Sequence, residues 1–162
     1  GRSLIVDALL VALAANLANL FDRAPGRTIK IACVAYVPLA FLLGATAPGI
    51  ALAPVIGAAV GLLGDDLHER LMLGDTGANA LGAALGLGVV LGGTESTRLT
   101  VMITLFALNI AAELVSFSRI IDGFAPLRAF DRLGQRPERQ MTSRRTPTPT
   151  RRRPGRDRRS AP

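Results

Sequence analysis

Residues 71–82 read LMLGDTGANALG and place one acidic residue, Asp75, between two glycines where a charged loop runs into a long apolar segment. Gly74 and Gly77 allow the backbone to turn tightly and to approach a ligand closely. Thr76 adds a hydroxyl group, and the amides that open the next helix favour an anion. Asp75 could therefore hold Mg²⁺, which prefers a carboxylate together with substrate phosphates. The alternative is that Asp75 only N-caps the helix that starts near Thr76.

The composition combines an apolar body with a basic tail. The 162 residues are 49% hydrophobic and carry a net charge of +7, with a mean hydropathy of +0.37. Thirteen of the nineteen basic residues lie from Arg119 onward, so residues 1–118 have a composition close to that of a membrane protein. Cys33 is the only cysteine, which excludes a disulfide framework and a cysteine-based metal site.

Five apolar segments approach the length of roughly 20 residues that crosses a bilayer. They cover residues 4–21, 29–47, 48–64, 77–92 and 99–118. We therefore predict an all-α polytopic membrane protein with about five transmembrane helices. The first segment lacks the basic start and the small-residue cleavage site of a signal peptide, so we expect it to be a transmembrane helix.

Two local patterns refine this prediction. Residues 46–49, Thr-Ala-Pro-Gly, predict a tight turn between the second and third segments. Gly82 and Gly86 have the small-xxx-small spacing that allows two helices to pack closely.

The distribution of basic residues predicts the orientation in the cell membrane. Arg23, Arg27 and Lys30 lie between the first two segments, Arg70 lies between the third and fourth, and the arginine-rich tail follows the fifth. By the positive-inside rule these three regions are expected to be cytoplasmic. The loops that follow the first and third segments would then share one face of a multi-pass protein.

A second polar element lies at the cytoplasmic end of the first segment, where residues 16–22 read NLANLFD. Asn16, Asn19 and Asp22 are spaced three apart and form a polar stripe on one side of a helix. Such a stripe is costly inside a membrane unless it faces protein, water or a ligand. The alternative to ligand binding is that these side chains make hydrogen bonds between helices.

Together the two elements resemble the polyprenyl-phosphate N-acetylhexosamine-1-phosphate transferases (glycosyltransferase family 4), which include the phospho-N-acetylmuramoyl-pentapeptide transferases. The resemblance covers about residues 11–86, lies with the C-terminal half of the family, and is most specific in Gly-Asp-Thr-Gly at residues 74–77. It implies a membrane enzyme of cell-wall (peptidoglycan) biogenesis. Such enzymes use Mg²⁺ to transfer a sugar phosphate from a UDP-sugar to a polyprenyl phosphate and release UMP.

The resemblance also implies roles for individual residues. Asp75 matches the magnesium-binding aspartate of the family, and Asp22 ends its polar helix near the nucleotide and the metal, so both are candidate catalytic residues. Asn16 and Asn19 are candidate substrate-binding residues on that helix. Gly74, Thr76 and Gly77 are candidate substrate-binding residues of the turn around the cation.

The chain departs from the family pattern in three places. The family's Asp-Gly-x-Asp-Gly reads DRAPG at residues 22–26, so Pro25 replaces the second aspartate and Arg23 the first glycine. The Asp-Asp pair of the family's N-terminal half and its histidine-rich loop have no counterpart here, where His68 is the only histidine. The resemblance therefore implies that transfer would require a missing N-terminal half. The alternative function is that of an inactive relative that binds lipid phosphate or scaffolds an envelope complex.

Other charged residues leave their roles open. Asp65 and Asp66 could supplement the metal site, although a solvated helix end is the favoured interpretation. Glu113 lies four residues from Asn109 in the fifth segment, where an ionisable residue indicates either a functional site or a polar pair that serves packing.

From Arg119 onward the chain changes character. Residues 119–137 predict a short amphipathic helix on the membrane surface, with Pro126 in its first turn and Gly134 at its end. Residues 138–162 are rich in Arg, Pro and Thr and are expected to be disordered. Arginines here would attract anionic membrane lipids, whereas no aromatic residues are interleaved to stack on nucleic-acid bases. The helices of residues 1–118 would need a partner, either a missing N-terminal half or a second copy, to cover their polar stripe.

Overall fold

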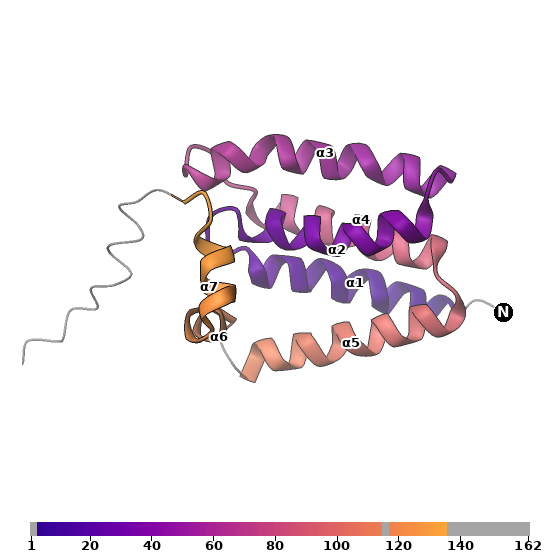
Figure 1. The fold of residues 1–162 in the computed structure, drawn as a ribbon. Helices are drawn as coiled ribbons and strands as arrows, with labels where there is room; N and C mark the ends of the chain where they lie inside the picture. The colour runs from indigo at the N-terminus through magenta and orange to yellow at the C-terminus, as the bar shows by residue number, and fades with distance from the viewer. Residues whose placement is uncertain (1–2, 115–116, 136–162) are drawn as a thin grey trace, which may run out of the picture.

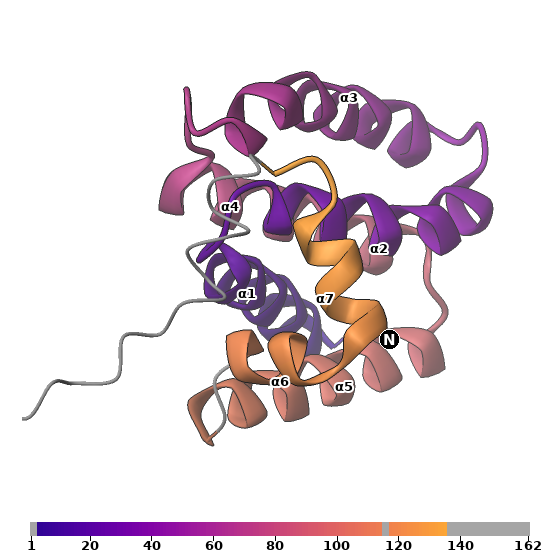
Figure 2. The same cartoon turned by 60° about the vertical axis from the view of Figure 1, so that its left-hand side comes forward.

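The computed structural model describes residues 3–114 and 117–135, and within them it describes the side chains except those of residues 113 and 117–119. This part of the chain is helical and contains no strand, which confirms the all-α prediction. The helices are α1 (Leu4–Phe21), α2 (Arg27–Leu43), α3 (Ala47–Leu67), α4 (Gly74–Gly92), α5 (Glu95–Leu114), α6 (Phe117–Gly123) and α7 (Ala125–Arg132). The five long helices lie side by side, and α6 and α7 lie across the end of the bundle where α1 ends (Figures 1 and 2).

Helix α4 organises the bundle. It packs against α1, α2 and α3, while α1 also packs against α5. Buried apolar side chains from α2, α3 and α4 form the main cluster, which includes Ile29, Leu43, Leu52, Ile56 and Leu81.

The glycines of α4 allow its backbone to approach that of α1. A Cβ atom added at Gly82 would lie 2.4 Å from the carbonyl oxygen of Ala14 and 2.7 Å from the Cβ atom of Ala18. At Gly86 it would lie 3.0 Å from the Cβ atom of Ala14. The small-residue spacing therefore marks a direct contact between helix backbones, as the sequence predicted.

The turn between α2 and α3 begins earlier than predicted. Gly44, with a φ of 53°, follows the last residue of α2, and Thr46 is the N-cap of α3, whose Pro48 lies in the first turn. The prediction of a turn at residues 46–49 was therefore wrong by about two residues, because proline is accommodated at the start of a helix, where its missing N–H would have no partner. The Thr46 hydroxyl instead donates a hydrogen bond to the carbonyl of Leu43 at 2.7 Å.

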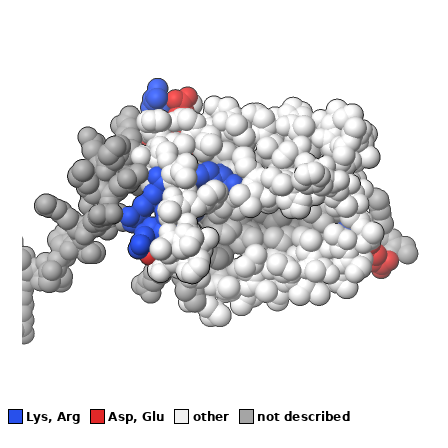
Figure 3. Space-filling view, viewed as in Figure 1, with Lys and Arg blue, Asp and Glu red and all other residues white. Residues whose placement is uncertain are grey.

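Two of the described helices, α1 and α3, are long and apolar enough to cross a membrane by length and composition. Helix α2 is shorter, with 17 residues, and its first turn contains the basic residues Arg27 and Lys30. Large apolar side chains nevertheless face outward, including Phe41 at 87% exposed and Ile50 at 66%. In the space-filling view the charged side chains gather toward the ends of the bundle, and the flank between them shows no charged residue (Figure 3).

The described part of the predicted amphipathic segment contains the end of α6 and, after a break at Phe124, the whole of α7. Helix α7 has Pro126 in its first turn, and Gly134 follows it with a φ of 81°, as the sequence predicted. Phe124 and Leu133, which flank α7, are 58% and 67% exposed. The predicted tail of residues 138–162 lies outside the described residues.

Candidate functional site

Three carboxylates from separate helices lie at the same end of the bundle. Asp22 follows the last residue of α1, Asp66 lies in the last turn of α3, and Asp75 lies in the first turn of α4. The negative charges of Asp66 and Asp75 both raise the pKa of Asp22, so each of them lies close enough to Asp22 to repel its charged form. The structure thus brings together the two predicted catalytic residues, Asp22 and Asp75, which are distant in the sequence.

Asp22 is partly buried, and its surroundings favour the protonated form. Burial is the largest cause that raises the pKa of its carboxyl above the ordinary 3.8, followed by the charges of Asp66 and Asp75. The Thr28 hydroxyl, which donates a hydrogen bond to Asp22 Oδ1 at 3.2 Å, and the backbone amide of Gly74 act in the opposite direction. A cation placed between these carboxylates would relieve their repulsion, so the site favours a positively charged ligand.

Asp66 is buried and fixes the loop that follows α1. Its side chain is 6% exposed, and its Oδ2 atom accepts a hydrogen bond from the amide of Gly26 at 2.9 Å. Gly26 has a φ of +69°, and a Cβ atom there would lie 2.5 Å from Leu67 Cδ2. A solvated helix end was therefore the wrong prediction for Asp66, because the loop folds back over it. It was correct for Asp65, which is 44% exposed and lies 3.5 Å from the Arg70 guanidinium.

Asp75 is exposed at the start of α4. The N-cap of this helix is Leu73, which makes no side-chain capping bond, and Asp75 lies inside the first turn. The alternative that Asp75 is the N-cap was therefore wrong, since the helix begins at Gly74, which has a φ of +66°. A carboxylate in this position is stabilised by the positive end of the helix dipole.

The other residues of the turn divide into two kinds. Thr76 is exposed next to Asp75. Gly77 packs against Leu73, whose Cδ1 atom would lie 2.7 Å from an added Cβ atom. Thr76 is thus available to a ligand, whereas Gly77 shapes the turn by packing.

The predicted polar stripe of α1 splits in the structure. Asn16 Nδ2 donates a hydrogen bond of 2.6 Å to Asn109 Oδ1 on α5, so Asn16 makes the interhelical contact that was the alternative to ligand binding. Asn19 Oδ1 is buried without a hydrogen-bond partner among the described residues. An unpaired buried acceptor is costly, so Asn19 is the better candidate for a ligand contact. The side chain of Glu113 lies outside the described part, so its role stays an open prediction.

The donor set is suited to a metal that retains other ligands. In the described parts of the chain, no three His, Cys, Asp or Glu side chains are grouped so that they could hold a metal ion by themselves. Mg²⁺ usually needs only one or two protein carboxylates and completes its shell with water and substrate phosphates. Asp22 and Asp75 could supply that number.

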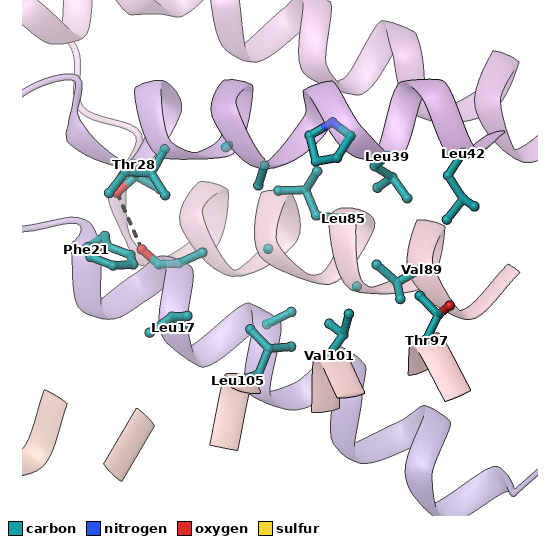
Figure 4. Close-up of a pocket in the computed structure, with 18 residues that line it drawn as sticks. Leu17, Phe21, Thr28, Leu39, Leu42, Leu85, Val89, Thr97, Val101 and Leu105 are labelled. Atoms are coloured by element: carbon teal, nitrogen blue, oxygen red, sulfur yellow. Dashed lines mark hydrogen bonds between the residues drawn. The ribbon is translucent and has the colours of Figure 1, made fainter. Parts of the chain in front are cut away.

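An apolar cavity of about 410 Å³ lies between α1, α2, α4 and α5. Phe21 and Thr28 line it at the end where the carboxylates meet, and Leu42 and Thr97 line it toward the opposite end (Figure 4). Thr28, which contacts Asp22, is therefore part of both the cavity wall and the polar site. The sequence analysis missed this cavity, although the small residues of α1 and α4 were a signal for it.

Sequence analysis also missed the contacts made by α7. Arg27 forms a buried ion pair with Asp131, and Lys30 donates hydrogen bonds to carbonyl groups at the end of α7. The available signal was the position of Arg27 and Lys30 at the start of an apolar segment. Charged side chains that become buried there need partners of opposite charge or hydrogen-bond acceptors.

Comparison with known proteins places this geometry in context. No family model and no solved structure matches the chain. It is 33% identical over 107 residues to the phospho-N-acetylmuramoyl-pentapeptide-transferase of Desulforamulus reducens, which covers 63% of this chain and 31% of that protein. It is 33% identical over 94 residues to the enzyme of the same name from Desulforudis audaxviator, covering 56% of this chain and 28% of that protein. The chain spans less than a third of each relative, and this distant, partial similarity supports a relationship to these transferases.

Proposed function

We propose that this chain is part of a membrane-embedded glycosyltransferase that transfers a sugar phosphate from a UDP-sugar to a polyprenyl phosphate in cell-wall biogenesis. The observation that carries the proposal is the meeting of Asp22 and Asp75 beside Thr28, at one end of an apolar cavity. Distant similarity to phospho-N-acetylmuramoyl-pentapeptide-transferases supports the same reaction class.

The carboxylates are suited to a reaction between two phosphates. A diphosphate and a lipid phosphate repel each other, and bound Mg²⁺ would supply the positive charge that brings them together. In this proposal Asp75 would hold the ion, and Asp22, at the end of α1, would complete the site. The amides that open α4 and the Thr76 hydroxyl orient the phosphate oxygens, while Asn19 contacts the nucleotide sugar.

The cavity is suited to the hydrocarbon part of the acceptor. Its lining is almost entirely apolar, and it lies on the bundle side of Thr28. An isoprenoid chain placed there would leave its phosphate near Asp22 and Asp75. Burial of apolar surface would then provide affinity, while the carboxylate end provides the chemistry.

We further propose a multi-pass location in the cell membrane, with the carboxylate end cytoplasmic. Five helices of this length, the outward-facing apolar side chains and the basic residues at the carboxylate end support this orientation. Helix α7 and the arginine-rich sequence after it would contact anionic lipid headgroups. A homo-oligomer or the remainder of a longer protein would cover the exposed flanks.

A second candidate function is supported by the loop at residues 22–26. Pro25 stands where the family has its second aspartate, so the loop contributes one carboxylate instead of two. A relative with this loop could bind a polyprenyl phosphate without transferring a sugar to it. This candidate predicts binding of metal and lipid phosphate in the absence of UMP release.

The deciding experiment measures Mg²⁺-dependent UMP release from a UDP-N-acetylhexosamine and polyprenyl phosphate, using the full-length gene product in detergent. Asp75→Asn should lower the rate by roughly 100-fold or more, because it would weaken the hold on the cation that stabilises the charge of the phosphoryl groups. Asp65→Asn is the matched control, since this aspartate lies in the last turn of α3, where its side chain is 44% exposed and paired with Arg70. Activity that survives in Asp75→Asn would contradict the assigned site, and binding without UMP release would support the second candidate.

A further inference from the structure

The end of α7 is tied to the start of α2 by a buried ion pair. Arg27 Nε lies 2.6 Å from Asp131 Oδ1, and Arg27 Nη2 lies 2.9 Å from Asp131 Oδ2. The two side chains are 7% and 12% exposed. This bidentate geometry fixes both direction and distance between two helices that are about one hundred residues apart in the sequence.

Lys30 makes a second tie one turn further along α2. Its Nζ atom donates hydrogen bonds to the carbonyls of Phe130 at 3.1 Å and Leu133 at 3.3 Å, and also to the carbonyl of Asp131. These carbonyls lie at the C-terminus of α7, where a helix lacks internal donors and carries partial negative charge. Lys30 also lies 5.7 Å from the centre of the Phe130 ring.

A third contact joins the residues after α7 to the loop between α1 and α2. Gln135 Nε2 donates to the carbonyl of Pro25 at 3.3 Å and to that of Asp131 at 2.9 Å. Residues 25–30 are therefore held by residues 130–135 on one side. On another side they are held by Asp66, which accepts from the Gly26 amide.

We propose that Asp131 is a positioning residue of the site, which holds residues 25–30 in place through Arg27. Thr28 follows Arg27 directly and donates the hydrogen bond that orients Asp22. The loop that lacks a second aspartate at Pro25 is thus stabilised by a carboxylate from α7. The role assigned to Asp22 rests on the proposed function, whereas the restraint on the loop does not.

The test compares amide hydrogen exchange in the full chain, purified in detergent without substrate, with and without Asp131→Asn. The amides of Arg27 and Lys30, which bond to the carbonyls of Ala24 and Gly26, report on the loop directly. We expect exchange across residues 22–30 to accelerate by about tenfold or more, with exchange in α3 and α4 unchanged. Unchanged exchange in residues 22–30, or equal acceleration throughout the bundle, would overturn the positioning role.

Three further variants make the test specific. Asp122→Asn is the matched control, because Asp122 is 59% exposed and lies 3.6 Å from Arg132 on the same pair of short helices. It should leave exchange in residues 22–30 unchanged. Asp131→Glu keeps the charge and should restore slow exchange, while Gln135→Ala should accelerate exchange mainly around Pro25 with little loss of stability. Failure of the Glu variant to rescue a well-folded protein would contradict the electrostatic account.

Activity measurements separate this proposal from the function it rests on. In an active protein, Asp131→Asn should lower kcat more than it raises KM, because the bound substrates would meet a displaced Asp22. An unchanged kcat together with unchanged exchange would overturn the positioning role. Absence of UMP release by the unmodified protein, together with faster loop exchange in Asp131→Asn, would reject the transferase and retain the restraint on the loop.

Discussion

At the scale of single residues, Asp22 combines a partly buried carboxyl with two nearby negative charges. Its pKa is raised above 3.8 in the folded protein, chiefly by burial. The contribution of Asp22 to stability is therefore fully present below pH 3.8 and is lost as the pH rises through the folded-state pKa. Above that point, an ionised Asp22 opposes folding unless a cation is bound.

This property predicts the pH dependence of Asp22→Asn. In buffers free of divalent cations, the variant should lose less stability than the unmodified protein as the pH rises from 4 toward neutrality, since its amide cannot ionise. Thermal unfolding in detergent across this range measures the difference. Asp65→Asn should follow the unmodified protein, and parallel curves for Asp22→Asn would show that the Asp22 environment is not as described.

Gly26 provides a second residue-scale prediction. Gly26→Ala should destabilise the protein by about 1–3 kcal/mol, because the backbone has positive φ and a Cβ atom would meet Leu67. Gly74→Ala is the control that separates these effects, since Gly74 has a similar φ of +66° but has open space around an added Cβ atom. Denaturation in detergent should give a larger loss for Gly26→Ala, and equal losses would remove the packing contribution.

At the scale of helices, sequence periodicity and composition were sufficient to place most elements. The first apolar segment and α1 share the same bounds, residues 4–21, because a polar loop follows immediately at Asp22. The start of α4 was predicted three residues late, since glycine at position 74 was interpreted as part of a turn although it opens the helix. Local patterns therefore located helices better than they located helix ends.

Contacts between distant segments were beyond the reach of these patterns. Asp65 and Asp66 are adjacent and chemically identical, yet one is exposed and the other is covered by the loop at Gly26. Nothing in the spacing of apolar residues states which segment will fold over a helix end. The contact of Arg27 with Asp131 was missed for the same reason. Asp22 and Asp75 were expected on one face only because the basic residues of their loops predicted a common side of the membrane.

The close contact between α1 and α4 at Gly82 and Gly86 leads to a prediction at the helix scale. Gly82→Ala should destabilise the protein by roughly 1–3 kcal/mol, because its methyl group would collide with the backbone of α1 at Ala14. Gly57→Ala, in open space on α3, should be neutral or stabilising by about 0.5–1 kcal/mol through helix propensity. Thermal melts of both variants give the comparison, and equal melting temperatures would contradict the close approach.

At the scale of the whole molecule, buried ion pairs fasten both ends of the bundle. At the end opposite the carboxylates, Arg98 Nη1 on α5 lies 2.7 Å from Asp7 Oδ1 on α1, and the side chains are 8% and 14% exposed. This pair joins the start of α1 to the start of α5. Arg27 and Asp131 make the corresponding tie at the site end.

The Arg98 pair predicts strong non-additivity between two substitutions. Asp7→Leu and Arg98→Met alone should each cost about 3–5 kcal/mol, because each leaves a buried charge without its counter-charge. The double variant Asp7→Leu with Arg98→Met should be much closer in stability to the unmodified protein, since it removes both charges together. Unfolding free energies of the variants in detergent test this, and additive losses would show that the pair is not buried as a unit.

The close contact between α1 and α4 at their glycines also limits which parts of the molecule can move. Asp22 ends one of these helices and Asp75 begins the other, and at Gly82 no side chain separates the two backbones. Two helices in such close contact resist sliding past each other, so the main chain sets the spacing between the end of α1 and the start of α4. The loop at residues 23–26 and α7 lie outside this contact, so they can shift to admit or release a ligand while α1 and α4 stay in place.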